Sequence, residues 1–296
     1  MMSGVLTCMR RNFLFPLHGR ALSQSSPDPP PGKLYQHPTK VSFYYDTLCP
    51  YSWLAYEILL RYRPIWALEL TLHPVSLRQI HEGNGGPSLL SKLRNSFHYS
   101  EYYFSDIQRK GKMIKVPIQI PESPFYLFGA AGSDNQQQFL LALSQKYPEL
   151  LEEGSRQFWY RTWGEDMDAN KLQSLLIMAR RIGLTQEEAV DLLESLDSHK
   201  ETLAAKSMEA IQEGAFDLPF IRINPQKKDS ECFVGADCFE LLAHRLQKTW
   251  KGPIPDPEDF ESIQEAPSPD LFVSLEVFDK IQEEVQKVNE TALNSK

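Results

Sequence analysis

The feature that most restricts the fold is a strand, a helix and a second strand in close succession. β-branched and aromatic side chains at 40–46 predict a strand, 51–61 has the spacing of a helix, and alternating leucines at 68–74 predict another strand. Strands joined through a helix run parallel, because a tight hairpin connects only antiparallel strands, and the crossover is right-handed. The chain therefore begins its folded region with a βαβ unit, which is typical of an α/β core.

A long helical block follows this unit. Between 135 and 214 the apolar residues recur with helical spacing, which predicts helices at 136–146, 149–163, 170–182, 186–196 and 199–213. Two capping boxes, Thr185 with Glu188 and Ser198 with Glu201, indicate helix starts. Gly183 and Gly214 stand where helices end in a left-handed residue. Trp159 and Trp163 lie on one helix face, and this spacing favours packing over a stacking platform for a ligand.

A second small unit closes the folded region. Residues 219–224 and 231–234 predict two strands joined by a polar turn at 225–230, and 237–248 predicts a helix. A βαβ unit and a ββα unit on either side of helices predict a thioredoxin-like α/β domain that is interrupted by an all-helical insertion.

The predicted boundaries follow from these units. We expect a transit peptide and linker at 1–39, the two parts of the thioredoxin-like domain at 40–76 and 214–252, a loop-rich segment and the helical insertion at 77–213, and a Pro-rich linker with an acidic helix at 253–296. The loop-rich segment, 76–124, contains an aromatic cluster at 99–104 that has the composition of a lid or substrate wall. The acidic helix is expected at 271–288.

Charge and cysteine content exclude several classes of function. A net charge of −8 and a pI of about 5.5 argue against nucleic acid as the main partner. No stretch approaches the ~20 apolar residues of a membrane span. Cys8, Cys49, Cys232 and Cys238 are too scattered for a disulfide framework or a zinc site, so we expect no metal and a reducing or mixed compartment.

The N-terminus predicts a destination. Arg10, Arg11 and Arg20 precede the first acidic residue, Asp28, in a segment rich in Ser and Leu. Such a segment is typical of a mitochondrial transit peptide, so we expect the mitochondrial matrix, with an unstructured tail as the alternative. The terminal tripeptide Asn-Ser-Lys does not match a peroxisomal signal.

Cys49 lies where the first predicted strand gives way to the first predicted helix. The free N–H groups and the dipole at a helix start favour a thiolate, which predicts a partly exposed, reactive sulfur. An ordinary buried cysteine is the alternative, since free cysteines are common in protein cores.

Two further segments provide candidate binding groups. In a thioredoxin-like arrangement the peptide bond before Pro219 is expected to be cis, which places Leu218 beside the group at position 49. The N–H and C=O of Leu218 can then pair with a bound peptide. At the last helix, free N–H groups near Ala236 suit a carboxylate and the Asp237 side chain suits an ammonium, which together fit an amino-acid head group.

With these residues in place, the chain resembles the kappa-class glutathione transferases. The resemblance covers residues 41–255 and rests on the runs FYYD at 43–46, PYSW at 50–53, PVS at 74–76, GN at 83–84, VPI at 116–118, GAFDLP at 214–219, GAD at 235–237, ELLAH at 240–244 and WKGPIP at 250–255. It implies that glutathione is the co-substrate, that no cofactor is permanently bound, and that the protein is a mitochondrial homodimer. The glutathione-binding residues that it implies are Pro50, Tyr51, Asn84, Leu218, Pro219, Ala236 and Asp237.

One departure from the family leaves several activities open. The family usually has serine where this chain has Cys49. Glutathione transfer to a small apolar electrophile, or peroxide reduction, is the leading interpretation. Monothiol disulfide exchange at Cys49 is the second, since Ser52 cannot act as a resolving cysteine. A glutathione-dependent isomerase and a non-enzymatic interaction protein are the remaining alternatives.

Overall fold

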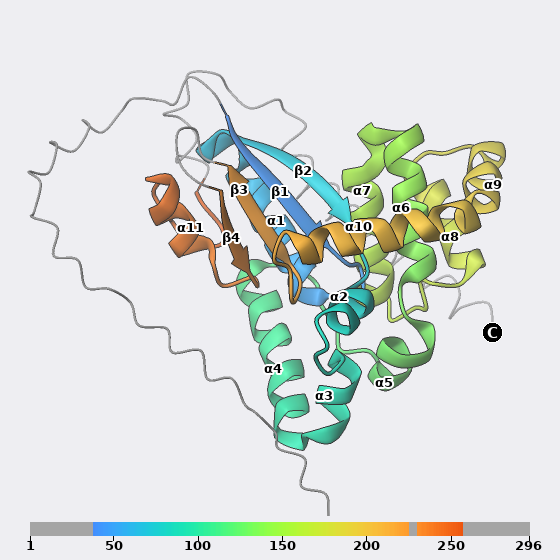
Figure 1. Ribbon diagram of the computed structural model, residues 1–296, viewed down its shortest axis with the longest axis horizontal. Helices are drawn as coiled ribbons and strands as arrows, with labels where there is room; N and C mark the ends of the chain where they lie inside the picture. Colours follow the sequence, from blue (N-terminus) through green and yellow to red (C-terminus); the bar gives the residue numbers. More distant parts are fainter. Residues whose placement is uncertain (1–37, 225–229, 257–296) are drawn as a thin grey trace, which may run out of the picture. The chain divides into compact units, whose positions relative to one another are not determined.

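A four-stranded mixed sheet lies at the centre of the folded region (Figure 1). The computed structural model describes residues 38–224 and 230–256. The strands are β1 (Thr39–Tyr45), β2 (Leu68–Pro74), β3 (Phe220–Asn224) and β4 (Glu231–Val234), in the order β2-β1-β3-β4. β1 is parallel to β2 and antiparallel to β3, with Val41 between Leu70 and Ile223, and β4 is antiparallel to β3. This topology confirms the predicted βαβ and ββα units.

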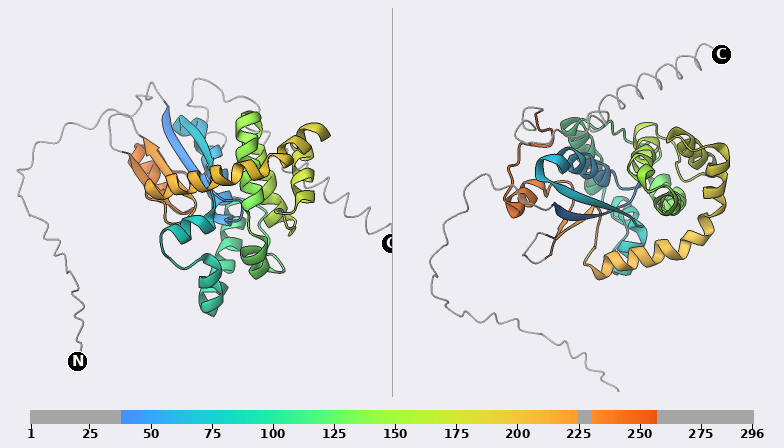
Figure 2. Two further views of the ribbon diagram at one scale, coloured as in Figure 1. Left: turned by 45° about the vertical axis from the view of Figure 1, so that its right-hand side comes forward. Right: turned by 90° about the horizontal axis from the view of Figure 1, so that it is seen from above.

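Helices cover the sheet on both faces. α1 (Pro50–Trp66) follows β1 and lies on one face, while α10 (Lys200–Gln212) crosses the other (Figures 1 and 2). α11 (Phe239–Leu246) closes the second unit, two residues shorter at each end than the predicted 237–248 helix. The sheet is therefore built from two segments, 39–74 and 220–234, that the helical insertion separates in the chain.

The helical insertion is confirmed. It contains α6 (Asp134–Lys146), α7 (Leu151–Trp159), α8 (Leu172–Arg181), α9 (Gln186–Glu194) and α10, with short turns η2 (Pro148–Leu150), η3 (Tyr160–Gly164) and η4 (Leu196–His199). Trp159 and Trp163 are fully buried, which confirms packing over a ligand platform.

The expected helix signals are confirmed in part. The Thr185–Glu188 capping box is formed at the start of α9, and Gly183 and Gly214 have φ of 92° and 103°. The box predicted at Ser198 is wrong, because Leu196–His199 forms a 3-10 turn in which the Ser198 hydroxyl donates to the Ser195 carbonyl. α10 therefore begins at Lys200 without a side-chain cap.

The loop-rich interpretation of 76–124 is wrong. This segment contains α2 (Leu77–Gly83), α3 (Leu89–Asn95) and α4 (Phe97–Ile114), followed by α5 (Pro124–Tyr126) and η1 (Leu127–Ala131). Ser76, Ser88 and Ser96 cap the first three helices, each accepting a hydrogen bond from the N–H three residues on. These caps supply partners for helix-start N–H groups in a segment with few aliphatic residues.

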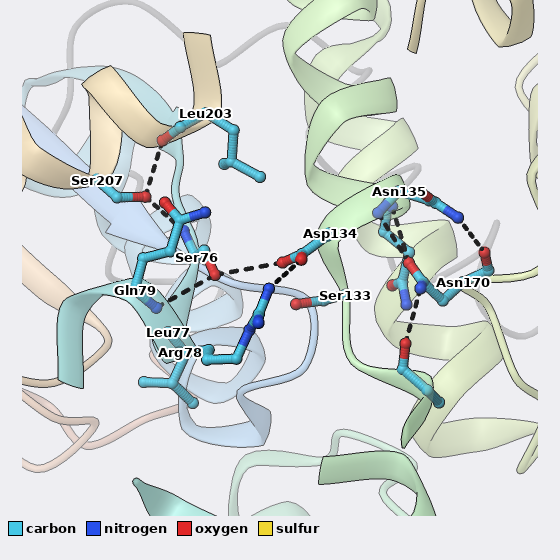
Figure 3. A network of polar contacts seen from close by, with 12 residues as sticks. Ser76, Leu77, Arg78, Gln79, Ser133, Asp134, Asn135, Asn170, Leu203 and Ser207 are labelled. Carbon is cyan, nitrogen blue, oxygen red and sulfur yellow. Dashed lines mark hydrogen bonds and ion pairs between the residues drawn. The ribbon is translucent and has the colours of Figure 1, made fainter. Parts of the chain in front are cut away.

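A polar network joins α2 to the insertion (Figure 3). The Ser76 N–H donates to Ser207 Oγ of α10 at 3.0 Å, and Arg78 forms an ion pair with Asp134 at the start of α6. Asn170 accepts a hydrogen bond from the Asn135 N–H in the same region. The end of β2 is thus connected to two helices of the insertion.

Several expectations lie outside the described residues. These are the transit peptide at 1–39 apart from its last two residues, most of the polar turn at 225–230, and the acidic helix at 271–288. Among the residues that are described, no helix is long and apolar enough to cross a membrane.

Candidate active site

Cys49 and Leu218 are in contact, Cys49 at the start of α1 and Leu218 two residues before β3. Cys49 is the N-cap of α1, and its Sγ donates to the Leu218 carbonyl oxygen at 3.3 Å, across 169 positions of the chain. The peptide bond between Leu218 and Pro219 is cis. Both findings confirm the predicted juxtaposition of the cysteine with the residue before the proline.

The expectation of an exposed Cys49 thiolate is wrong. The residue is 3% exposed, and burial raises the pKa of its thiol to about 12. The neighbouring polar groups of Ser52 lower this pKa, but they do not offset the loss of water. Near neutral pH the sulfur therefore carries its proton and acts as a hydrogen-bond donor.

A buried carboxyl group supports the loop that carries Cys49. Asp46 accepts hydrogen bonds from the N–H groups of Leu48 and Leu77 at 2.8 Å, from Ser133 Oγ at 2.9 Å and from Gln137 Nε2 at 3.0 Å. Burial raises the pKa of Asp46 to about 6, although the hydrogen bonds from Leu48, Leu77 and Ser133 act in the opposite direction. A single side chain thus connects the loop to α2 and to the insertion.

The two buried tryptophans hold the same loop from the insertion side. The Trp159 indole N–H donates to the Asp46 carbonyl and the Trp163 indole N–H donates to the Thr47 carbonyl, both at 3.2 Å. The insertion therefore binds the backbone that leads to Cys49. The sequence predicted that these tryptophans pack, but not that they donate hydrogen bonds to this loop.

A cavity of about 340 Å³ opens beside the cysteine. Five of the predicted site residues line it, namely Cys49, Tyr51, Leu218, Ala236 and Asp237. The remaining three, Pro50, Pro219 and Asn84, are not among its lining residues. The two prolines are buried, and Asn84 Nδ2 donates to the Ile80 and Ala215 carbonyls at 2.8 and 2.9 Å. In this structure the Asn84 amide therefore connects α2 to the segment that leads to Leu218.

One end of the cavity is charged. Asp237 lies two residues before the first residue of α11, whose N-cap is Cys238. Its carboxylate instead accepts from Lys110 Nζ of α4 at 2.9 Å, and the same ammonium donates to Asp106 at 2.7 Å. Burial would lower the pKa of Lys110, but the two carboxylates raise it. Sequence reasoning missed both α4 residues, whose i, i+4 spacing was the available signal.

A second missed carboxylate lies next to Leu218. Asp217 Oδ1 accepts a hydrogen bond from the Leu218 N–H at 2.9 Å and lies 3.2 Å from His81 Nε2. Burial would raise the pKa of Asp217, but the hydrogen bond and charge of His81 lower it below its usual value. Both backbone groups of Leu218 are thus paired within the protein, the N–H with Asp217 and the C=O with Cys49.

The wall next to Cys49 is aromatic and apolar. Tyr99, Tyr102 and Tyr103 of α4 line it together with Leu77 and Leu89. The aromatic cluster predicted as a lid or substrate wall does line the cavity, but as one face of a helix. In the described part of the chain no group of His, Cys, Asp and Glu could hold a metal ion.

A family model matches most of this architecture. The model of the DSBA-like thioredoxin domain matches residues 40–247, from the first strand to the last helix. The match spans the helical insertion as well as both sheet units.

Curated relatives match a similar part of the chain. Human glutathione S-transferase kappa 1 is 35% identical over 222 residues, which are 74% of this chain and 95% of the human protein. The rat protein of the same name is 33% identical over the same shares of the two chains. A Caenorhabditis elegans glutathione S-transferase kappa 1 is 22% identical over 220 residues, or 73% of this chain and 94% of the other.

Solved structures with low identity share the fold. A 2-hydroxychromene-2-carboxylate isomerase superposes with a TM-score of 0.57 at 19% identity, over 70% of this chain and 94% of the isomerase. A putative protein disulfide isomerase from Nitrosomonas europaea gives a TM-score of 0.53 at 12% identity, over 71% and 98% of the two chains. At these identities the likeness extends to the arrangement of helices and strands.

Proposed function

Since this chain belongs to the DSBA-like thioredoxin domain family and, within it, to the kappa-class glutathione S-transferases, we propose that it binds glutathione and transfers it to small apolar electrophiles. One observation carries this proposal. The Cys49 thiol and the Leu218 backbone meet in a cavity whose other end carries Ala236 and Asp237. A cavity with a sulfur-binding end and a charged end suits a tripeptide with a thiol and an amino-acid head group.

The proposed binding mode exchanges internal contacts for contacts with the ligand. The cysteinyl part of glutathione pairs with the Leu218 N–H and C=O, which are paired with Asp217 and Cys49 in this structure. The γ-glutamyl ammonium pairs with Asp237. The glutathione sulfur then lies against Cys49, with the aromatic wall of α4 beside it for an apolar electrophile.

Cys49 takes part in this reaction as a neutral donor. Its raised pKa keeps the proton on sulfur, so the thiol can donate a hydrogen bond to the glutathione sulfur and favour the glutathione thiolate. That thiolate forms a carbon–sulfur bond with the electrophile, whose leaving group departs with the electron pair. The proton released by glutathione goes to solvent. A protonated, buried Cys49 disfavours disulfide exchange as the main activity, because exchange requires a thiolate.

The test uses glutathione binding and conjugation of a chloronitrobenzene. We expect the wild-type protein to bind glutathione and form the conjugate, Cys49→Ser to retain or raise this activity, and Cys49→Ala to lose most of it. Removal of glutathione from a mixed disulfide should remain slow in the wild-type protein and vanish in Cys49→Ser. No calorimetric binding at millimolar glutathione would contradict the proposal and favour an interaction protein.

We further propose that the protein acts in the mitochondrial matrix as a homodimer. The basic, acid-free segment before Asp28 supports the location. The dimer is what the resemblance to kappa-class transferases implies. Import of a fluorescent fusion carrying residues 1–39, and light scattering of the purified chain, test the two parts separately.

A further inference from the structure

The ammonium group of Lys110 holds two carboxylates together at the charged end of the cavity. Its Nζ donates to Asp106 Oδ2 at 2.7 Å and to Asp237 Oδ2 at 2.9 Å, and it lies 5.2 Å from the centre of the Tyr51 ring. The side chain of Asp106 is 11% exposed, whereas that of Asp237 is 72% exposed. One partner of the lysine is therefore shielded from solvent and the other is accessible to a ligand.

Asp106 anchors the lysine independently of Asp237. Asp106 and Lys110 are one turn apart on α4. The Tyr51 hydroxyl donates at 2.8 Å to Asp106 Oδ2, the oxygen that also accepts from Lys110. If Asp237 were taken by another cation, Lys110 would keep Asp106 and the Tyr51 ring as neighbours. An ammonium has three donors, so the donor released from Asp237 would remain at the cavity wall, available to an anion.

The γ-glutamyl group of glutathione carries the two charges that this arrangement can bind. Its α-ammonium and α-carboxylate are attached to one carbon atom. When the ammonium binds Asp237, the carboxylate beside it comes next to the released donor of Lys110. Asp106, Lys110, the ligand carboxylate, the ligand ammonium and Asp237 would then alternate in sign, so each charge has an opposite neighbour.

Resting on the proposed glutathione binding, we propose that Lys110 is a specificity-determining residue that exchanges Asp237 for the α-carboxylate of the γ-glutamyl group. In this structure the lysine keeps Asp237 paired. A thiol ligand that brings only an ammonium separates this pair without giving the lysine a new partner. Full affinity therefore requires both charges of the head group.

The experiment compares three ligands by calorimetry. They are glutathione, 4-aminobutanoyl-cysteinylglycine, which lacks the α-carboxylate, and glutaryl-cysteinylglycine, which lacks the α-ammonium. We expect wild-type protein to bind glutathione about tenfold or more tightly than the analogue without the carboxylate, because that analogue loses a charge-assisted hydrogen bond. Lys110→Met should remove most of this preference and Lys110→Arg should retain it. Lys112→Met, an exposed position on the same helix, is the matched control.

The other outcomes overturn the inference in distinguishable ways. Tighter glutathione binding by Lys110→Met would mean that the lysine only blocks Asp237. If Lys110→Met weakens the binding of glutathione and of the analogue without the carboxylate by the same factor, the lysine makes a structural contribution alone. If Lys110→Met does not fold, Lys110→Gln is measured against the same ligands, with the same outcomes. Absence of glutathione binding by wild-type protein would contradict the proposed function itself, whereas binding with a preference that does not depend on Lys110 contradicts only this inference.

Discussion

At the scale of single residues, burial decides the chemistry of Cys49. A helix start favours a thiolate, yet the pKa of this buried thiol is raised to about 12. We expect the rate of alkylation of Cys49 by iodoacetamide to rise about tenfold per pH unit from about pH 7 to pH 10, since the thiolate fraction rises in that proportion. Peptide mass spectrometry measures the rate, with the exposed Cys232 as an internal reference. A plateau near neutral pH would contradict this prediction.

Asp46 gives a second prediction at this scale. Its folded pKa of about 6 exceeds the usual 3.8, so the folded protein binds this proton more tightly than the unfolded chain. The contribution of Asp46 to the free energy of unfolding is therefore greatest below about pH 4 and declines by about 3 kcal/mol as pH rises through the folded pKa.

The substitution Asp46→Asn tests this linkage. An amide presents an NH₂ group where the carboxylate accepted hydrogen bonds, so we expect a loss of about 1–3 kcal/mol in the free energy of unfolding near neutral pH. The loss should be larger at about pH 4.5, because the wild-type protein alone gains stability from protonation. Urea denaturation at several pH values measures both. A difference between the two proteins that does not change with pH would show that Asp46 titrates normally.

At the scale of elements, the insertion supports the loop that carries Cys49. Trp163 of η3 is fully buried, and its indole N–H donates to the Thr47 carbonyl. Trp163→Phe leaves that carbonyl without this donor, so we expect a loss of about 2 kcal/mol in the free energy of unfolding. We also expect weaker glutathione binding, because the loop loses a restraint. Denaturation and calorimetry measure the two effects.

Trp66→Phe is the matched control for this prediction. Its indole N–H donates to the Thr249 carbonyl at 3.1 Å, and the residue does not line the cavity. We expect a similar loss of stability with glutathione affinity unchanged. Equal effects of both substitutions on affinity would mean that the insertion stabilises the protein without positioning the site.

The elements also show what the sequence could and could not predict. Strands β1 to β4 and the helices of the insertion follow periodic apolar patterns, so local spacing predicted them. α4 was missed because its buried positions include Tyr103, Asp106 and Gly111, which do not form an aliphatic stripe. Its start depends on the serine cap at Ser96. The serine just before the helical stretch, at a position that N-caps favour, was the available signal.

At the scale of the whole molecule, long-range contacts were predictable only where the fold itself implies them. Cys49 and Leu218 were brought together correctly because the thioredoxin-like topology places the first helix beside the third strand. The contact of Lys110 with Asp237 joins a helix that was not predicted to a loop, so no pattern in the sequence implied it. The burial of Cys49 was likewise unpredictable, since it depends on how residues far apart in the sequence pack around the sulfur.

The end of the described chain returns to α1 and joins the second sheet unit to the first. Trp250 stacks on Tyr62 of α1 with ring centroids 4.9 Å apart and on Phe239 of α11 at 5.9 Å. Beside it, the Tyr62 hydroxyl donates to the Gly252 carbonyl at 2.7 Å and Arg61 donates to the Pro253 carbonyl at 3.0 Å. Segment 250–253 therefore connects elements that come from opposite ends of the folded region.

Trp250→Ala tests whether this segment contributes to the stability of the whole molecule. The substitution removes a half-buried ring and its aromatic contacts, so we expect a loss of about 2–3 kcal/mol in the free energy of unfolding. Glutathione affinity should not change at a temperature where the variant is folded, because Trp250 does not line the cavity. Leu241→Ala, at a residue of α11 that is 61% exposed, is the control and should have little effect.

The shape of the unfolding curve of Trp250→Ala tests the coupling of the two sheet units. A single urea transition with an unchanged slope would show that the two sheet units still unfold together. Two separate transitions would show that the aromatic contacts of Trp250 couple the two units.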